Sequence, residues 1–177
     1  VGIVIDITDQ KETELKLKES EGRFRKLFED HASAILIIDS ETFRILNANN
    51  AAIKFYGWPS EMIHGLNISD ITTTSPEELL DAKRTIQNHS NTHFSSIHRK
   101  ADGSHVEVEV FCNHSNLSKK SVFFCIVIDV SERNKAHKEA QKRQAILDAA
   151  LNSMSDAVVI TDLQGSPIEF NNAFLAF

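Results

Sequence analysis

The sequence predicts an α+β fold in which two short strands, several short helices and one longer helix precede three long antiparallel strands, with amphipathic linker helices on both sides. Three observations predict it. The hydrophobic period changes from about 3.6 to 2 near residue 90. Segments rich in Glu, Lys and Leu, which are good helix formers, stand on either side. A phrase of eight residues, IVIDITDQ at residues 3–10, returns as IVIDVSER at residues 126–133.

The repeated phrase indicates a tandem organisation, because its neighbours keep nearly the same offset. Ala34 and Ala157 are 123 residues apart, and Asn49 precedes Asn171 by 122. We therefore expect one complete unit between fragments of two others. The expected parts are the last strand of a preceding unit (1–8), a linker helix (9–20), the complete unit (21–133), a second linker helix (134–150) and the start of a following unit (151–177).

Charge and composition exclude several classes of protein. The net charge of −6 is spread along the chain without a basic stripe, so we expect no nucleic-acid binding and no contact with a membrane surface. No apolar run approaches the roughly 20 residues that span a bilayer. The two cysteines are too few for a disulfide scaffold and lack CxxC spacing for zinc. A cytoplasmic location follows as the expectation, although the parent protein is free to carry a membrane anchor elsewhere.

Residues 9–28 and 134–151 are expected to form the linker helices. Thr8 and Ser131 stand where N-cap residues are expected. Apolar residues recur at spacings of seven and four in both segments, as in Leu17, Phe24 and Phe28. Such a narrow apolar stripe allows either coiled-coil pairing or an ordinary solvated connector.

The first half of the complete unit reads as a hairpin followed by helices. Ser75, Pro76 and Glu78 combine a serine cap, a proline at the first helical position and a capping-box glutamate, which predicts a helix from about residue 76 to residue 88. Asn49 and Asp70 are expected to brace turns. The earlier elements are expected at 34–39 and 44–47 (strands), 51–56 (a helix stopped by Gly57), and 60–64 and 67–71 (single turns).

The second half reads as three strands. Residues 92–99 and 105–113 flank an Asp-Gly turn that is typical of hairpins, and the stretch from His105 alternates valine with polar residues as in a half-buried strand. Residues 122–129 are apolar throughout, which favours a central strand.

This order of elements resembles the PAS fold, and five phrases resemble that family's motifs. They are FRKLFE (24–29), ILNANNAA (45–52), FYGWPSEMIHG (55–65), RKADGS (99–104) and IDVSER (128–133). The resemblance implies a five-stranded antiparallel sheet with short helices on one face, in a multi-PAS signalling protein such as a sensor histidine kinase or a diguanylate cyclase. It also implies that residues 128–133 lead from the sheet into a signalling helix.

PAS domains sense ligands, light, oxygen or redox state, or act as dimerisation adaptors, and the sequence narrows this range. Photosensors of the family that bind flavin covalently need a cysteine that residues 71–75 lack. Relatives that bind haem place a histidine on the longer helix, whose body, 76–87, contains none. We therefore expect neither group, and the cofactor stays unknown. No catalytic motif or metal-ligand spacing occurs, so we expect neither an enzyme nor a metal site.

Histidines and cysteines in the strands allow two further hypotheses. His93, His98 and His105, with His114, could form a metal or proton-sensing cluster, but solvated strand positions are the favoured interpretation. If the turn at 116–121 is centred between residues 118 and 119, Cys112 faces Cys125 across neighbouring strands. A redox switch is conceivable, but two small buried thiols are favoured.

A ligand pocket, if present, is expected between the sheet and the longer helix. Seven apolar residues are candidates to line it, and the same residues could instead close a dry core. They are Ile37, Phe55, Ile71, Leu79, Ile86, Val108 and Val127.

These observations lead to one principal hypothesis, a sensory or adaptor module. It relays a ligand or conformational signal through Asp129, Val130 and Ser131 into the following helix and an effector domain. The alternative is a ligand-free spacer and homodimerisation module, which pairs through the linker helices or the sheet.

Overall fold

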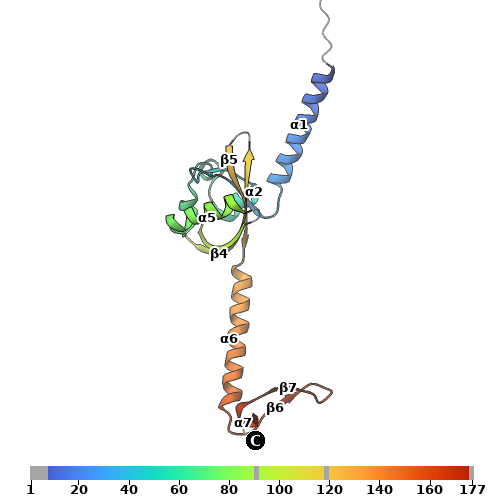
Figure 1. The fold of residues 1–177 in the computed structure, drawn as a ribbon, viewed down its shortest axis with the longest axis vertical. Helices are drawn as coiled ribbons and strands as arrows, with labels where there is room; N and C mark the ends of the chain where they lie inside the picture. Colours follow the sequence, from blue (N-terminus) through green and yellow to red (C-terminus); the bar gives the residue numbers. More distant parts are fainter. Residues whose placement is uncertain (1–7, 90–91, 118–119, 176–177) are drawn as a thin grey trace, which may run out of the picture. The chain divides into compact units, whose positions relative to one another are not determined.

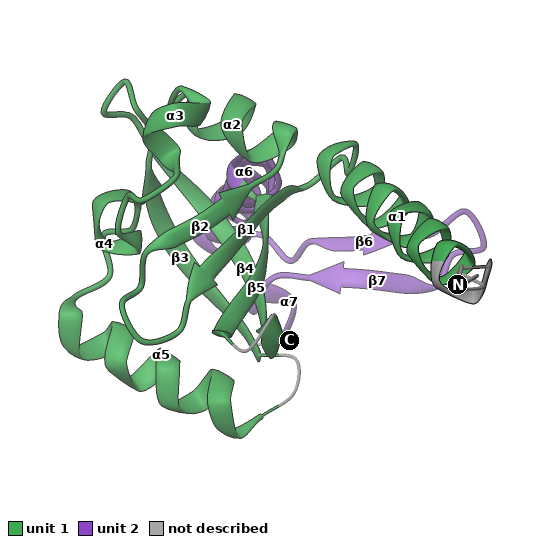
Figure 2. Cartoon of the chain, turned by 90° about the horizontal axis from the view of Figure 1, so that it is seen from above, with its two compact units in different colours: residues 1–130 green, residues 131–177 purple. Residues whose placement is uncertain are grey.

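The computed structural model describes residues 8–89, 92–117 and 120–175. The chain divides into two compact units, with the boundary after Val130 (Figure 2). The strand expected at residues 1–8 lies outside the described residues apart from Thr8, which is the first residue of helix α1 (Thr8–Glu29). Among the described residues, no helix combines the length and apolar character that crossing a membrane requires.

The first unit contains a five-stranded antiparallel sheet in the order β2-β1-β5-β4-β3, which confirms the expected fold class (Figure 2). Chain order and spatial order differ, because the last strand lies between the first strand and the fourth. The strands are β1 (Ala34–Asp39), β2 (Ile45–Ala48), β3 (Thr92–Arg99), β4 (His105–Leu117) and β5 (Lys120–Asp129). The last two extend beyond the expected bounds, β4 to Leu117 and β5 from Lys120, and residues 118 and 119 lie outside the described residues.

Burial follows the alternation of the sequence. In β4, Val106, Val108 and Val110 are buried while the residues between them are partly exposed. In β1, both alternating sets are buried: Leu36 packs into the main core, and Ile35 and Ile37 pack with Phe28 of α1 on the other face. The continuous apolar run of β1 is explained by this burial, because a strand that is covered on both faces needs apolar residues at successive positions.

Short helices cover the main-core face of the sheet (Figure 2). They are α2 (Asn50–Tyr56), α3 (Ser60–Ile63) and α4 (Ile68–Ile71). Gly57 ends α2 with φ of 75°, a left-handed conformation that glycine adopts without strain. Asp70 accepts a hydrogen bond from the Asn67 backbone N–H at 2.9 Å, which closes a capping box on α4.

The longer helix α5 (Pro76–Asn88) begins as its sequence predicts. Ser75 caps the backbone N–H of Glu78, and the Glu78 carboxylate accepts a hydrogen bond from the Ser75 N–H at 2.9 Å. Its buried side chain is Ile86, which faces the sheet.

Two further helices flank the sheet along the chain, α1 and α6 (Ser131–Ser153) (Figure 1). Ser131 is the first residue of α6, so it is not a cap that precedes the helix. Among the residues of α1 and α6 whose burial is described, most apolar side chains are exposed, whereas Phe28 is buried and Leu151 is half-buried. Beyond α6, the second unit contains a hairpin of β6 (Val159–Thr161) and β7 (Pro167–Phe170), followed by α7 (Asn172–Leu175).

Candidate functional site

A cavity of about 290 Å³ lies in the first unit between α5 and the inner face of the sheet. Four strands of the five-stranded sheet, β1, β3, β4 and β5, contribute to its wall, and so does the segment between α4 and α5. Leu36 of β1, Val110 of β4 and Phe123 of β5 supply part of its apolar surface. A volume near 300 Å³ is at the small end of the range for small-molecule sites.

The structure brings only some of the seven expected pocket residues to this cavity. Leu79, Ile86 and Val127 line it. Ile71 and Val108 are fully buried in the same core but do not border the cavity. Phe55 packs against that core from α2 and is likewise outside the lining.

Ile37 lies on the opposite face of the sheet, so its expected place in the cavity wall needs correction. It packs with Phe28 and Val122, while its neighbours Leu36 and Ile38 face the cavity. A strand buried on both faces gives no polar residue from which the inner face can be read. The expected lining residue, Ile37, is therefore one position away from the two residues of β1 that line the cavity, Leu36 and Ile38.

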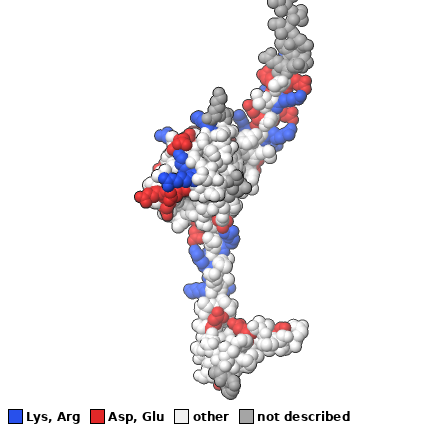
Figure 3. All heavy atoms as spheres, viewed as in Figure 1, with Lys and Arg blue, Asp and Glu red and all other residues white. Residues whose placement is uncertain are grey.

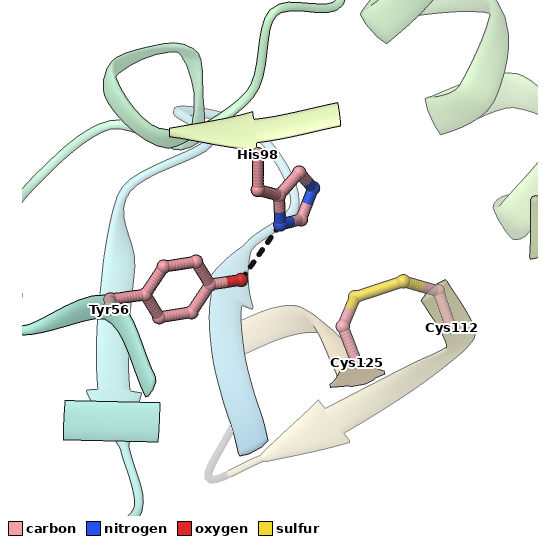
Figure 4. The surroundings of a disulfide bond; sticks show 4 residues. All are labelled: Tyr56, His98, Cys112 and Cys125. Atoms are coloured by element: carbon pink, nitrogen blue, oxygen red, sulfur yellow. Dashed lines mark hydrogen bonds between the residues drawn. A yellow bond between two sulfur atoms is a disulfide. The ribbon is translucent and has the colours of Figure 1, made fainter. Parts of the chain in front are cut away.

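A buried histidine and tyrosine meet at one corner of the cavity (Figure 4). The Tyr56 hydroxyl lies 2.8 Å from Nδ1 of His98 in a hydrogen bond. Both residues are buried, with exposed fractions of 0% and 3%. Burial disfavours the charged form of each: it lowers the pKa of His98 to about 4 and raises the pKa of Tyr56. The pair is therefore neutral at neutral pH.

The expectation of a solvated position is wrong for His98. A usable signal was present, because Phe94, Ser96 and His98 alternate along one face of β3. His93 and His105 do lie at partly or fully exposed positions of the strands. Within the described ranges, no group of three His, Cys, Asp or Glu side chains is placed to hold a metal ion.

Three hydroxyl groups form a cluster beside His98. Thr72 Oγ1 lies 2.7 Å from Thr74 Oγ1 and 3.0 Å from Ser96 Oγ, and the last two are 3.2 Å apart. All three residues line the cavity. Sequence reasoning did not single them out, because their approach depends on an isolated bridge between Thr72 and His98 that no local pattern encodes.

Cys112 and Cys125 form a disulfide bond in the cavity wall (Figure 4). The expected register is confirmed, since the two residues are paired directly across β4 and β5 with Cα atoms 4.2 Å apart. The preference for two free thiols is wrong. Direct pairing brings two sulfur atoms within bonding reach, whereas the sequence by itself gives only the facing positions.

The expected relay residues lie where β5 ends. Asp129 is the last residue of the strand and pairs with Val108 of β4. Val130 is buried, and its backbone N–H donates a hydrogen bond to the Glu107 carbonyl at 3.0 Å. Ser131 begins α6 directly. Strand and helix are thus joined by one anchored residue.

Acidic and basic side chains are intermixed along α1 on the face shown in Figure 3. Two ion pairs within that helix, Lys16 with Glu12 and Arg23 with Glu19, illustrate the mixture. Pairs of this kind, four residues apart, add a few tenths of a kcal/mol each to a helix.

Comparison with known proteins identifies related sequences. A family model described as PAS domain matches residues 32–132. Sporulation kinase E of Bacillus subtilis (strain 168) is 26% identical over 171 residues, which are 97% of this chain and 23% of that protein. Diguanylate cyclase DgcM of Escherichia coli (strain K12) is 23% identical over 128 residues, 70% of this chain and 31% of that protein. The chain thus spans less than a third of the curated relatives it matches.

Solved structures share the fold. The PAS domain of an HTR-like protein from Haloarcula marismortui superposes with a TM-score of 0.61 at 23% identity, over 67% of this chain and 98% of that one. A PAS domain from a two-component sensor histidine kinase gives a TM-score of 0.55 at 18% identity, over 63% and 98% of the two chains.

Proposed function

The chain belongs to the PAS domain family, and from this premise we propose that it is a sensory module which binds a small molecule in its cavity and relays occupancy into α6. One observation carries the proposal. The strand β5 supplies Phe123, Cys125 and Val127 to the cavity wall. It ends at Asp129, two residues after Val127, and α6 begins at Ser131.

The relay has a simple physical basis. A guest that changes the packing of Val127 acts on a strand held between β1 and β4. Val130, anchored on Glu107, then transfers that change to the first turn of α6. Such coupling needs two states of the junction whose balance shifts by roughly 1 to 3 kcal/mol, a typical allosteric free energy.

An Asp129→Ala substitution in the full-length parent protein tests the relay. We expect effector output to lose its response to the signal, while the sheet keeps its fold. Asp81→Ala is the matched control and should leave the response intact, because this exposed carboxylate of α5 pairs with Arg84 of the same helix. Signalling by the Asp129 variant that equals wild type would contradict the relay.

The alternative function is a ligand-free spacer that forms homodimers. Exposed apolar side chains support it: Leu17 and Phe24 on α1, Leu147 on α6, and Phe111 and Ile128 on the outer face of the sheet. Such side chains are found at helix pairs and interfaces. Native mass spectrometry separates the two functions, because a retained small molecule favours the sensor and an empty dimer favours the spacer.

For the parent protein we propose a signalling effector downstream, a histidine kinase or a diguanylate cyclase, with this segment non-catalytic and bound to neither nucleic acid nor membrane. The matches to a sporulation kinase and a diguanylate cyclase support this. We propose a cytoplasmic location, which fractionation of cells that express the full-length parent protein tests. Recovery of this segment on the outer side of the cell membrane, open to added protease in intact cells, would contradict that location.

A further inference from the structure

The cavity is polar mainly at one corner. Thr72 and Thr74 reach it from the segment between α4 and α5, and Ser96 and His98 reach it from the adjoining strand β3. The wall contributed by β1, β4 and β5 is aliphatic, aromatic or disulfide sulfur, as in Leu36, Phe123 and Cys125. A guest therefore meets hydrogen-bonding groups at one end and apolar surface along the rest.

The hydroxyl cluster has a limited hydrogen-bonding capacity. Each of the three hydroxyls has one proton and two lone pairs. Three contacts of 2.7 to 3.2 Å within the cluster use all three protons, and Thr72 Oγ1 also accepts from the Thr74 backbone N–H at 3.1 Å. What remains for a guest is acceptor capacity on Thr74 and Ser96, so this cluster favours a guest that donates.

His98 adds a single adjustable group. Its Nδ1 is occupied by the Tyr56 hydroxyl, and its Nε2 lies on the far side of the ring from Tyr56 (Figure 4). A neutral imidazole holds one proton and one lone pair. Nε2 therefore donates when Tyr56 donates to Nδ1, and accepts when Nδ1 donates to Tyr56.

The charged side chains of the lining are already engaged. Lys83 pairs with Glu41 at 2.9 Å and lies 5.9 Å from the centre of the Phe43 ring. The Glu78 carboxylate accepts from the backbone and hydroxyl of Ser75 at 2.9 and 2.8 Å. An ionised guest would thus enter an apolar cavity without a free counter-charge, which is costly.

From this distribution we propose that the cavity binds a small uncharged molecule, largely apolar, with one hydroxyl or similar donor-acceptor group directed at Ser96, Thr74 and His98. The inference deepens the proposed sensory function and rests on it. A single aromatic ring is compatible with the volume, since a cavity of roughly 150 Å³ already binds benzene in another protein.

Three one-ring probes test the proposal on the 177-residue chain by NMR titration: benzyl alcohol, toluene and benzoate. We expect benzyl alcohol to bind about tenfold more tightly than toluene, the equivalent of one good hydrogen bond. We expect benzoate to bind most weakly, with shifts for the bound probes centred on residues that line the cavity, such as Phe94 and Val110. Toluene binding as tightly as benzyl alcohol would overturn the inference.

Paired variants show whether the polar corner is responsible. Thr74→Val combined with Ser96→Ala removes two acceptors and should abolish the preference for benzyl alcohol over toluene. Thr73→Val is the matched control, because Thr73 is exposed and its hydroxyl donates to the Ile97 carbonyl outside the cavity. A preference that persists in the double variant would contradict the assignment.

The remaining outcomes distinguish this inference from the sensory function. Benzoate binding most tightly, and losing affinity in Lys83→Met, would replace the uncharged guest by an anionic one and leave a ligand sensor in place. Failure of all three probes at millimolar concentration would overturn the guest class. The relay itself is judged separately by the Asp129 variant.

Discussion

Each of the two units contains a hairpin that is held by a buried asparagine at an equivalent position. The two hairpins differ in what covers them. In the first unit, Asn49 Oδ1 accepts from the N–H groups of Ile35 and Ala52, both at 2.9 Å. In the second unit, Asn171 Oδ1 accepts from Val158 and Phe174 at 2.9 and 3.1 Å. The side-chain amides of Asn49 and Asn171 donate to carbonyls before each hairpin, Phe28 and Ser33 in one unit and Leu151 and Asp156 in the other. Each of these four partners of Asn49 has its counterpart at an offset of 122 or 123 residues.

Burial separates the two hairpins. The first five residues of β1 are buried, whereas all three residues of β6 are exposed. The reason is the neighbouring strand: β1 pairs with both β2 and β5, and β6 pairs with β7 in a two-stranded sheet. The hydrogen bonds around each asparagine therefore form a local structure that neighbouring residues specify. The buried core of the first unit depends in addition on β5, which comes much later in the chain.

Hydrogen exchange should show the largest difference between the hairpins. Amides of Ile35 and Leu36 open only with the whole first unit, whose stability we place in the usual range of about 5 to 15 kcal/mol. A two-stranded hairpin such as β6–β7 is marginally stable. We expect exchange at Val159 and Ile160 to be faster by roughly three orders of magnitude or more, measured by NMR. Equal protection would mean that the second hairpin is covered in solution.

Substitution of the two asparagines should give the next largest contrast. Asn49→Ala leaves several buried backbone groups without partners, and we expect a loss of about 4 kcal/mol in the free energy of unfolding of the first unit. Urea denaturation followed by the fluorescence of Trp58, the single tryptophan of the chain, reports on that unit alone.

Asn171→Ala is the matched control for this substitution. It should leave the Trp58 transition unchanged to within about 0.5 kcal/mol, while the β6–β7 amide signals lose their dispersion. A shift of the Trp58 transition as large as that of Asn49→Ala would show that the two units unfold together.

Reduction of the disulfide should affect the first unit only, because residues 131–177 contain no cysteine. The bond closes a loop with a sequence separation of 13. Loop-closure entropy then predicts a loss of about 3 kcal/mol on reduction, measured by the Trp58 transition with and without reductant. A Cys112→Ala, Cys125→Ala double variant should be insensitive to reductant. A reduced wild type as stable as the oxidised one would indicate that the bond adds no stability.

The sequence predicted those features that depend on neighbours in the chain. Three such features act within a few residues: the alternation of apolar and polar residues in the strands, the capping box at Ser75 and Glu78, and the left-handed Gly57. The fold class and most element bounds were therefore predictable. The facing of Cys112 and Cys125 followed from register across one short turn.

The composition of the cavity wall was less predictable, because it depends on which face of each strand turns inward. β1 is apolar on both faces, which placed Ile37 in the wall instead of Leu36 and Ile38. His98 is a polar residue at a core position, and its hydrogen bond with Tyr56 offsets the cost of burying the imidazole. Polarity patterns cannot reveal a pairing between residues 42 positions apart.

The buried histidine gives the smallest expected effect and again separates the units, since the second unit has no buried histidine among its described residues. The pKa of His98 in the folded protein, about 4, is below its ordinary value of 6.5, so the unfolded chain binds the proton more readily. The stabilisation is therefore complete above pH 6.5 and is lost as the pH falls toward 4. Between pH 7 and pH 5 we expect a loss of about 2 kcal/mol. His98→Gln should remove this part of the pH dependence of the Trp58 transition, and a variant with the same slope as wild type would assign the dependence to other groups.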